Sequence, residues 1–201
     1  MFDLTHLIQT FSYLGLFIIV FAETGLLIGF FLPGDSLLIT AGLLAAEGSL
    51  NLWGVVAVCV LAAIIGNIAG YLLGFKVGPL LFSQPKSRLF NPEHVQKTHD
   101  YFEKHGPKTI ILARFIPIIR TFIATISGIS GMGFEKFALY SVVGGLLWGA
   151  GLPIIAYYLG RMIPDLDKYL LLVIGVVILV SFIPVGLEFL KHRKLAKVPN
   201  K

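Results

Sequence analysis

The sequence has little charge for its length, and this absence excludes most soluble folds. Only 13% of its 201 residues are Asp, Glu, Lys or Arg, whereas 56% are hydrophobic. A soluble domain carries about 25% charged residues. The composition therefore predicts an integral membrane protein, and the length suits a single transmembrane domain over residues 1–201.

Cysteine is scarce in the sequence, and histidine is missing from its apolar segments. The single cysteine, Cys59, excludes an internal disulfide and is expected to be a packing residue. No histidine lies in the apolar segments described below, so a metal site or a base for a serine nucleophile is not expected there. Gly34–Leu37 matches the four letters of a GDSL hydrolase signature, a match that chance produces easily. We expect no enzymatic activity, no cofactor, no bound metal and no nucleic-acid partner.

Long uncharged runs predict the membrane-spanning helices. Residues 51–75 and 137–160 carry no charge and are long enough to cross about 30 Å of hydrocarbon. Residues 169–187 form a shorter span, and residues 13–31 form another if Glu23 is tolerated. The fold is therefore predicted to be all α-helical.

Two further apolar pieces are too short to cross the membrane. Residues 33–46 begin with Pro33-Gly34, and residues 110–129 are interrupted by Pro117. Segments of this length favour re-entrant or interfacial placement, and broken backbone at membrane depth must be buried in protein or line a wet cavity. We expect each piece to form a re-entrant helical hairpin.

The order of elements repeats along the chain. A broken hairpin, a glycine turn, an uncharged span and a Tyr-x-x-Gly end occur within about residues 11–75 and again within about residues 109–160. A connector, residues 76–108, joins these repeats, and a final span with its tail covers residues 165–201. The predicted fold is thus two hairpin-plus-helix repeats with additional spanning helices.

Basic residues predict the orientation of these elements, because positive loops stay in the cytoplasm. The basic residues of the connector and the tail are Lys76, Lys86, Arg88, Lys97, Lys104, Lys108, Lys191, Arg193, Lys194, Lys197 and Lys201. An even number of crossings must separate connector and tail, so residues 110–129 enter from the cytoplasm and residues 33–46 from outside. Both termini are then cytoplasmic, and the halves form an inverted-topology repeat, the architecture of many secondary transporters.

Four charged side chains interrupt the apolar stretches. Between residues 11 and 46 the only charges are Glu23 and Asp35, and between residues 109 and 134 the only charges are Arg114 and Arg120. A charge at membrane depth costs at least about 2.5 kcal/mol, so it normally faces a partner or a wet cavity and serves function.

The two acids are candidate proton carriers. Burial favours the protonated form of the Glu23 carboxyl, and the alternative for this residue is a protonated, hydrogen-bonded structural group. Asp35 has a competing interpretation as the cap of a short helix that begins near Ser36-Leu37. Both roles are compatible, since a cap at a broken helix also lines the cavity.

Arg114 and Arg120 are candidate phosphate ligands. A guanidinium group stays charged and holds phosphate through two parallel hydrogen bonds. A break at Pro117 would bring together two side chains that a regular helix separates. Two guanidinium groups in an apolar hairpin suit a phosphate head group whose tail stays in lipid. The alternatives are ion pairs with Glu23 or Asp35 and, for Arg114, extension to the cytoplasmic surface.

Small residues predict close helix packing in the first long span. Gly66, Gly70 and Gly74 lie on one helix face, which suits helix contact and also permits a homodimer. For Asn67, which lies beside these glycines, we expect one of two roles: it lines a cavity between the helices, or it joins two helices by a hydrogen bond. The candidates for lining a cavity are Asn67, Ser36 and Thr121.

Two motifs resemble the signatures of the bacterial DedA membrane proteins. Phe21–Gly25 with Phe31–Leu38 is similar to the first signature, and His105–Thr121 is similar to the second. Gly66–Tyr71 resembles the glycine-rich span of the family, in which an Asp is common at the position of Asn67. The resemblance covers nearly the whole chain.

The resemblance implies lipid translocation in the bacterial cytoplasmic membrane. Members are implicated in returning undecaprenyl phosphate or in moving phospholipids such as phosphatidylethanolamine, and the family is related to eukaryotic VTT-domain scramblases. Some members behave as if driven by the proton-motive force. The essential acids and arginines of the family fall on Glu23, Asp35, Arg114 and Arg120.

We therefore expect a multi-pass, proton-coupled flippase that recycles undecaprenyl phosphate, with lipid and protons as its partners. Arg114 and Arg120 would hold the phosphate, and Glu23 and Asp35 would take up protons. One alternative is a phospholipid flippase or scramblase that uses the same site. Another is a proton-coupled transporter of a small ion, in which the arginines act only as gates.

Overall fold

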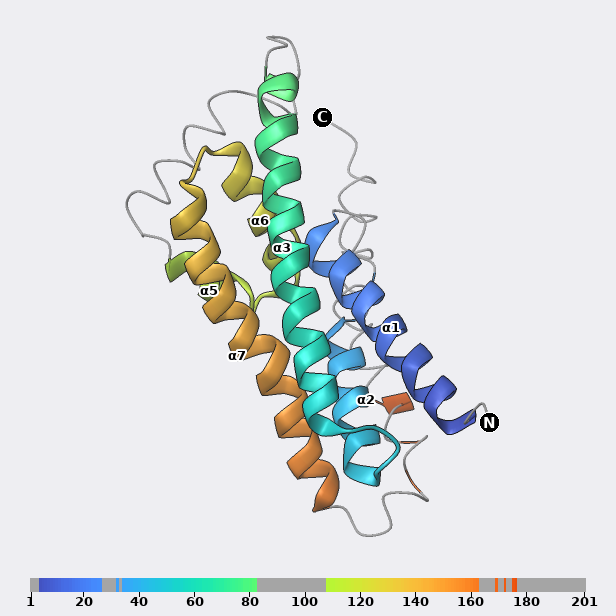
Figure 1. Cartoon of the computed structure of the whole chain (residues 1–201). Coiled ribbons are helices and arrows are strands. Elements are labelled where there is room, and N and C mark those ends of the chain that lie inside the picture. Colours follow the sequence, from blue (N-terminus) through green and yellow to red (C-terminus); the bar gives the residue numbers. More distant parts are fainter. Residues whose placement is uncertain are drawn as a thin grey trace, which may run out of the picture. The chain divides into compact units, whose positions relative to one another are not determined.

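The structure, a computed structural model, describes residues 4–26, 32, 34–82, 108–162, 169, 172 and 175–176, without the side chains of 4–11, 78–82 and 117–118. Every regular element in these residues is an α-helix (Figure 1). The helices are α1 (Leu4–Gly25), α2 (Gly34–Glu47), α3 (Leu52–Phe82), α5 (Lys108–Ala113), α6 (Pro117–Ile129) and α7 (Phe134–Arg161). The predicted all-helical class is confirmed for this part of the chain.

The two longest helices are apolar and long enough to cross a membrane. The segments that meet both criteria are Leu52–Val77 in α3 and Phe134–Arg161 in α7. These are the spans predicted over residues 51–75 and 137–160. α3 itself continues past the apolar span to Phe82, so the first residues of the predicted connector are helical. A lysine ends an apolar run, but it does not end a helix, because lysine is a good helix former.

The first helix lies closer to the N-terminus than predicted. The expected span covered residues 13–31, whereas α1 runs from Leu4 to Gly25 and its 22 residues extend about 33 Å. The polar residues before Tyr13 shortened the apolar run without opposing a helix. Glycine is a common residue at helix ends.

Three predicted regions lie largely or wholly outside the described residues. They are the connector after Phe82, the final span at 169–187 and the tail that follows it. In the final span, only Tyr169, Leu172, Gly175 and Val176 are described, and they have helical conformation.

The chain divides into two compact units. The first comprises Met1–Leu32 and Trp53–Gly151, and so contains α1, α3, α5, α6 and the first part of α7. The second comprises Pro33–Leu52 and Leu152–Lys201, and so contains α2 and the end of α7. Within the second unit, Gly42 of α2 packs directly on α7, since a Cβ at Gly42 would lie 2.8 Å from the Cβ of Ala156.

Glycines of α3 bring neighbouring helices into backbone contact in the first unit. A Cβ at Gly70 would lie 3.1 Å from the carbonyl oxygen of Gly25 on α1, and a Cβ at Gly25 would lie 2.6 Å from that of Gly66. A Cβ at Gly74 would overlap the carbonyl oxygen of Thr125 on α6. The glycine face predicted from the sequence therefore packs α3 against both α1 and α6.

An aromatic cluster fixes the turn between α6 and α7. The buried ring of Tyr71 on α3 stacks on Phe137, with 4.6 Å between ring centroids, and its hydroxyl donates to the carbonyl of Met132. Gly131 in this turn has φ of 72°, a conformation that favours glycine. These contacts tie the end of α6 and the start of α7 to α3.

The described helices repeat one order of elements. The 14-residue α2 and the 13-residue α6 each lead through a short turn into a long apolar helix. Each turn contains a glycine with positive φ, 99° at Gly48 and 72° at Gly131. The structure thus contains the sequence of short helix, glycine turn and long helix twice.

Candidate functional site

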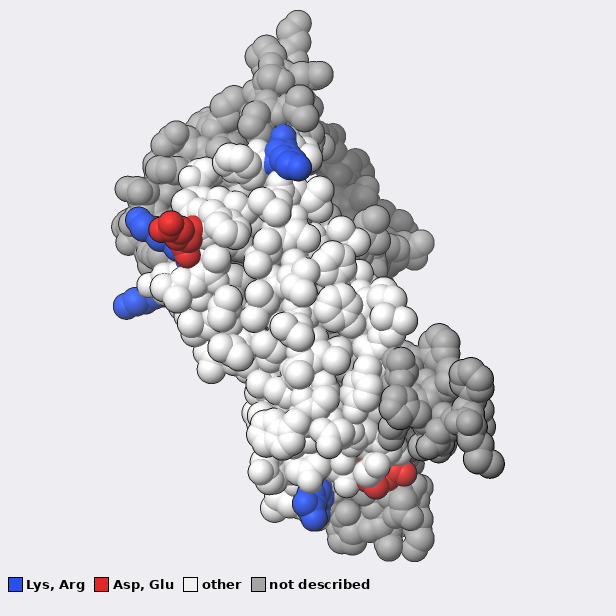
Figure 2. Space-filling view, viewed as in Figure 1, with Lys and Arg blue, Asp and Glu red and all other residues white. Residues whose placement is uncertain are grey.

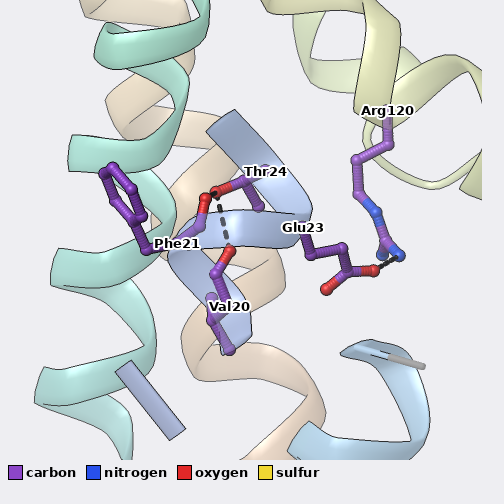
Figure 3. A network of polar contacts seen from close by, with 5 residues as sticks. All are labelled: Val20, Phe21, Glu23, Thr24 and Arg120. Carbon is purple, nitrogen blue, oxygen red and sulfur yellow. Dashed lines mark hydrogen bonds and ion pairs between the residues drawn. The ribbon is translucent and has the colours of Figure 1, made fainter. Parts of the chain in front are cut away.

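The first unit buries an ion pair between α1 and α6. The guanidinium of Arg120 donates through Nη2 to the Glu23 carboxylate, and the two residues are 97 positions apart in the sequence. Figure 3 shows Glu23 reaching from α1 toward Arg120. Glu23 is 2% exposed and Arg120 4% exposed, so both charges are removed from the surface of the protein. The ion pair that the sequence left as an alternative is present.

Thr24, the neighbour of Glu23, bonds to its own helix. Its hydroxyl donates to the carbonyl of Val20 at 2.9 Å, with a longer contact of 3.5 Å to that of Phe21 (Figure 3). A bond of this type satisfies a buried threonine within the helix. The hydroxyl is therefore satisfied by α1 itself.

The Arg120 guanidinium lies over the ring of a tryptophan of α7. Arg120 Cζ lies 4.6 Å from the ring centroid of Trp148, within the range of a cation–π contact. Trp148 is 2% exposed. Arg120 therefore contacts both the Glu23 carboxylate and the Trp148 indole.

Arg114 is buried between α3 and α7. It is 1% exposed, so the predicted alternative in which it extends to the cytoplasmic surface is wrong. Its Nη2 contacts the Ala63 carbonyl at 3.5 Å, and its stem lies against Gly144. Nε and Nη1 are buried, and no described residue forms a hydrogen bond with either. This guanidinium therefore retains donors for a ligand.

The break in the helix positions the two arginines. The residue before a proline disfavours the helical region, and Ile116 has φ of −110° and ψ of 108° before Pro117. The chain turns after α5, where the backbone N–H of Arg114 donates to Ile111 at 3.2 Å. Arg114 thus precedes the break and Arg120 follows it, as the sequence predicted. The two guanidinium groups are close enough to interact electrostatically.

Three charged side chains are buried together in the first unit. With all groups ionised, the Arg114 and Arg120 guanidinium groups and the Glu23 carboxylate sum to one positive charge. The adjacent N-terminus of α6 adds a partial positive charge. Such an arrangement attracts an anion and holds it by charge-assisted hydrogen bonds.

Asp35 and Ser36 belong to the second unit. α2 begins at Gly34, so the expected start near residues 36–37 is two residues late, and Asp35 lies inside the first turn. A carboxylate is favourable at this end of a helix. Asp35 is half-buried and Ser36 is 1% exposed.

The remaining candidate side chains are buried in the first unit. Asn67 of α3 donates through Nδ2 to Ser141 Oγ of α7 at 2.7 Å, so it joins two helices, one of its two predicted roles. Thr121 follows Arg120 on α6 and is 3% exposed. Within the described residues, no group of three His, Cys, Asp or Glu side chains is arranged to hold a metal.

Two contributors to the cluster were absent from the sequence prediction. Trp148 and Gly144 contact the arginines from α7, yet in the sequence they read as an ordinary aromatic and a helix-packing glycine. Their spacing of four residues, which places them on one helix face, was the available signal.

The comparison with known proteins identifies the family. The VTT domain model matches residues 32–161, and the chain is 43% identical to Protein DedA of Escherichia coli (strain K12) over 183 residues. The protein belongs to the DedA family. The alignment covers 90% of this chain and 83% of the E. coli protein. It is therefore a membrane protein of a family associated with membrane transport.

Other DedA relatives are also named as membrane proteins. Inner membrane protein YqjA of E. coli (strain K12) is 36% identical over 157 residues, with 78% of this chain and 71% of the relative covered. A Mycobacterium tuberculosis (strain ATCC 25618 / H37Rv) membrane protein is 45% identical over 172 residues, with 85% and 75% covered. No solved structure matches the chain.

Proposed function

We propose that this DedA protein carries a lipid phosphate across the bacterial cytoplasmic membrane, and that undecaprenyl phosphate is its substrate. The observation that carries the proposal is the buried cluster of Arg114, Arg120 and Glu23 with its excess positive charge. A phosphate monoester is an anion of opposite sign, and its oxygens suit the fork geometry of guanidinium. The long lipid tail would remain in the membrane during transport.

The Glu23–Arg120 ion pair allows a phosphate to replace the Glu23 carboxylate at Arg120. A phosphate oxygen competes with the Glu23 carboxylate for the Arg120 guanidinium, because both are anionic acceptors. A proton on Glu23 weakens its hold on Arg120 and favours the phosphate. Proton binding and phosphate binding then assist each other, as thermodynamic linkage requires.

Arg114 has a different part in the same proposal. Its guanidinium already has two buried donor atoms with no hydrogen-bond partner among the described residues. The Arg114 guanidinium would remain in place as a positive charge while Arg120 exchanges the Glu23 carboxylate for the phosphate. Asp35, in the first turn of α2, is proposed as the second proton-carrying acid. Ser36 and Thr121 are proposed to line the cavity.

The repeated order of helices supports transport by alternating access. We infer that α2 with α3 and α6 with α7 form inverted halves, each with a re-entrant hairpin, and that both termini are cytoplasmic. Inverted repeats allow one half to open to each side of the membrane in turn. The protein would then act as a multi-pass transporter in the inner membrane, without enzymatic activity.

Purified protein in vesicles tests this function. Undecaprenyl phosphate in the inner leaflet becomes accessible to an external phosphatase only if it is transported, and labelled phosphatidylethanolamine serves as the competing substrate. We expect transport of undecaprenyl phosphate that Arg120→Lys lowers at least tenfold, because lysine lacks the planar fork. Arg161→Lys, at an exposed arginine near the end of α7, is the matched control. Preferential movement of phosphatidylethanolamine would indicate the phospholipid alternative.

The pH dependence of transport tests the role of Glu23. Among the described residues of the first unit, Arg120 on α6 forms an ion pair with Glu23, and Arg114 after α5 interacts with it electrostatically. Trp148 of α7 adds an uncharged contact to Arg120. We expect wild-type transport to rise as the pH falls and Glu23→Gln to lose this response. A wild-type rate that is independent of pH, together with an active Glu23→Gln variant, would show that Glu23 carries no proton.

A further inference from the structure

Both buried arginines rest on one stretch of α7. A Cβ at Gly144 would lie 2.9 Å from Arg114 Cδ and 3.1 Å from its Nε. One helical turn further on, the ring of Trp148 lies 4.6 Å from Arg120 Cζ. Positions four residues apart share a helix face, so a single face of α7 supports both guanidinium groups.

We propose that Gly144 and Trp148 are positioning residues that set the spacing and orientation of Arg114 and Arg120 for one phosphate group. We call Gly144 and Trp148 the arginine platform. The inference rests on the proposed function, because it describes how the same site recognises its ligand. Through these two residues, α7 would contribute to substrate selectivity, a role that the sequence pattern does not indicate.

Glycine is required at one side of the platform by space. The stem of Arg114 occupies the volume in which a side chain at residue 144 would lie. The next residue, Gly145, is also crowded, since its Cβ would lie 3.0 Å from Ile64 Cγ1 and 3.8 Å from Arg114 Nη2. Alanine at residue 144 would therefore displace the guanidinium of Arg114 relative to that of Arg120.

The indole at the other side restricts where Arg120 can move. The guanidinium lies over the Trp148 ring, so this contact is with the π face of the indole. Glu23 accepts a hydrogen bond from Nη2 of the same guanidinium. When phosphate replaces Glu23, the contact with Trp148 keeps the guanidinium in position. The platform thus makes Arg120 ready for exchange between two anions.

A platform that sets geometry affects selectivity as well as affinity. Phosphate presents its oxygens in a tetrahedron, whereas a fatty-acid carboxylate presents two in a plane, so a fixed spacing of two guanidinium groups distinguishes them. A residue that merely stabilises the fold would lower the amount of active protein without changing this preference. The preference for phosphate over carboxylate is therefore the decisive measurement.

The test compares platform variants with matched controls in vesicles. We would measure KM and kcat for undecaprenyl phosphate, and the concentration of oleate that halves transport, in Trp148→Leu, Trp148→Phe and Gly144→Ala. Gly151→Ala is the glycine control, because a Cβ there meets nothing within 4 Å. Leu147→Ala is the control for truncation, at a side chain that is 53% exposed.

We expect Trp148→Leu and Gly144→Ala to raise KM about tenfold, a change of about 1.4 kcal/mol, and to lower the preference for phosphate over oleate. Trp148→Phe, which keeps a smaller aromatic face, should fall between them and wild type. Both controls should retain wild-type KM and preference. If every platform variant keeps the wild-type KM and preference, or loses only its yield of folded protein, the platform has no positioning role.

The same vesicles separate this inference from the proposed function. If the platform variants transport undecaprenyl phosphate as the wild type does, the inference is overturned but the proposed function is not. Transport of phosphatidylglycerol instead, with the same sensitivity to Trp148→Leu, overturns the proposed substrate and supports the platform. Absence of transport for both lipids in the wild type overturns both.

Discussion

At the scale of single residues, the main feature is the buried ion pair between Glu23 and Arg120. Glu23 and Arg120 lie in apolar helices and would each be costly alone. Replacing such a pair with apolar residues is often neutral, whereas removing one partner leaves an uncompensated charge. Stability alone is therefore a weak reason for the pair, which is consistent with the proposed exchange with a phosphate.

The stability of single and double variants tests the coupling of Glu23 and Arg120. We expect Arg120→Gln and Glu23→Gln to lower the free energy of unfolding, by about 3–5 kcal/mol where an ionised partner is left behind. The double variant should lose less than the sum of the two, because neither charge then remains. Chemical unfolding in detergent measures all three values.

An exposed arginine provides the reference for this comparison. Arg161→Gln, at the end of α7, should change the free energy of unfolding by no more than about 0.5 kcal/mol. Strict additivity of the Glu23 and Arg120 effects would mean that the two charges are not coupled in the folded protein.

At the scale of helices, the glycine face of α3 determines how closely its neighbours approach. We expect Gly74→Ala to destabilise the protein by about 1–3 kcal/mol, because its Cβ would overlap the carbonyl oxygen of Thr125. Gly15→Ala on α1 is the matched control, since its Cβ meets nothing within 4 Å. Alanine there should stabilise the helix by about 0.5–1 kcal/mol. In thermal unfolding, a loss of stability in Gly74→Ala and a gain in Gly15→Ala would establish packing as the cause. A change in the same direction in both variants would refute it.

A buried polar contact joins the two long helices. The Asn67–Ser141 hydrogen bond is buried, so Asn67→Leu and Ser141→Ala should each cost about 1 kcal/mol of unfolding free energy. The double variant should cost little more than the larger single loss. A double variant at the full sum would show that the two side chains act independently.

The sequence predicted the long helices well because membrane crossing imposes length and hydropathy together. α3 and α7 correspond to the uncharged runs, and the helix break fell at Pro117 as expected. The ends of α1 and α3 were predicted less well. Hydropathy marks where lipid contact ends, whereas a helix continues through polar residues such as Lys76 that have adequate helix propensity.

The sequence identified the charged residues of the candidate site and gave the ion pair with Glu23 only as an alternative. Glu23, Arg114 and Arg120 stood out because an intramembrane charge is costly. Their pairing depends on tertiary packing between α1 and α6, which residues 97 positions apart do not reveal in a single sequence. Trp148 was missed for a related reason, since an aromatic residue in an apolar helix has no local signal for the cation that it covers.

At the scale of the whole molecule, several exposed charged side chains lie at helix ends. Among described residues, Glu47 ends α2, Glu135 lies in the first turn of α7, and Arg161 ends it. Figure 2 shows a face on which most of the described surface carries no Lys, Arg, Asp or Glu. A surface of this kind suits contact with lipid along the helices and with water at their ends.

The proposed orientation makes a prediction about the two turns that contain left-handed glycines. By the distribution of positive charge, the turn after α2 faces outside and the turn between α6 and α7 faces the cytoplasm. A cysteine at exposed Ser49 should therefore react with a membrane-impermeant maleimide in intact spheroplasts, and one at exposed Gly133 should react only after permeabilisation.

The chain itself supplies the controls for this labelling experiment. Its only native cysteine, Cys59, is buried, so the wild type reports the background. A cysteine at Met162, just beyond α7 and 77% exposed, should label from outside, because α7 starts in the cytoplasm and crosses once. The three sites together define the direction of α7 and the side of the turn after α2. If Ser49 and Gly133 label from the same side, α2–α3 and α6–α7 enter the membrane in the same sense, and the inverted relation that alternating access requires is absent.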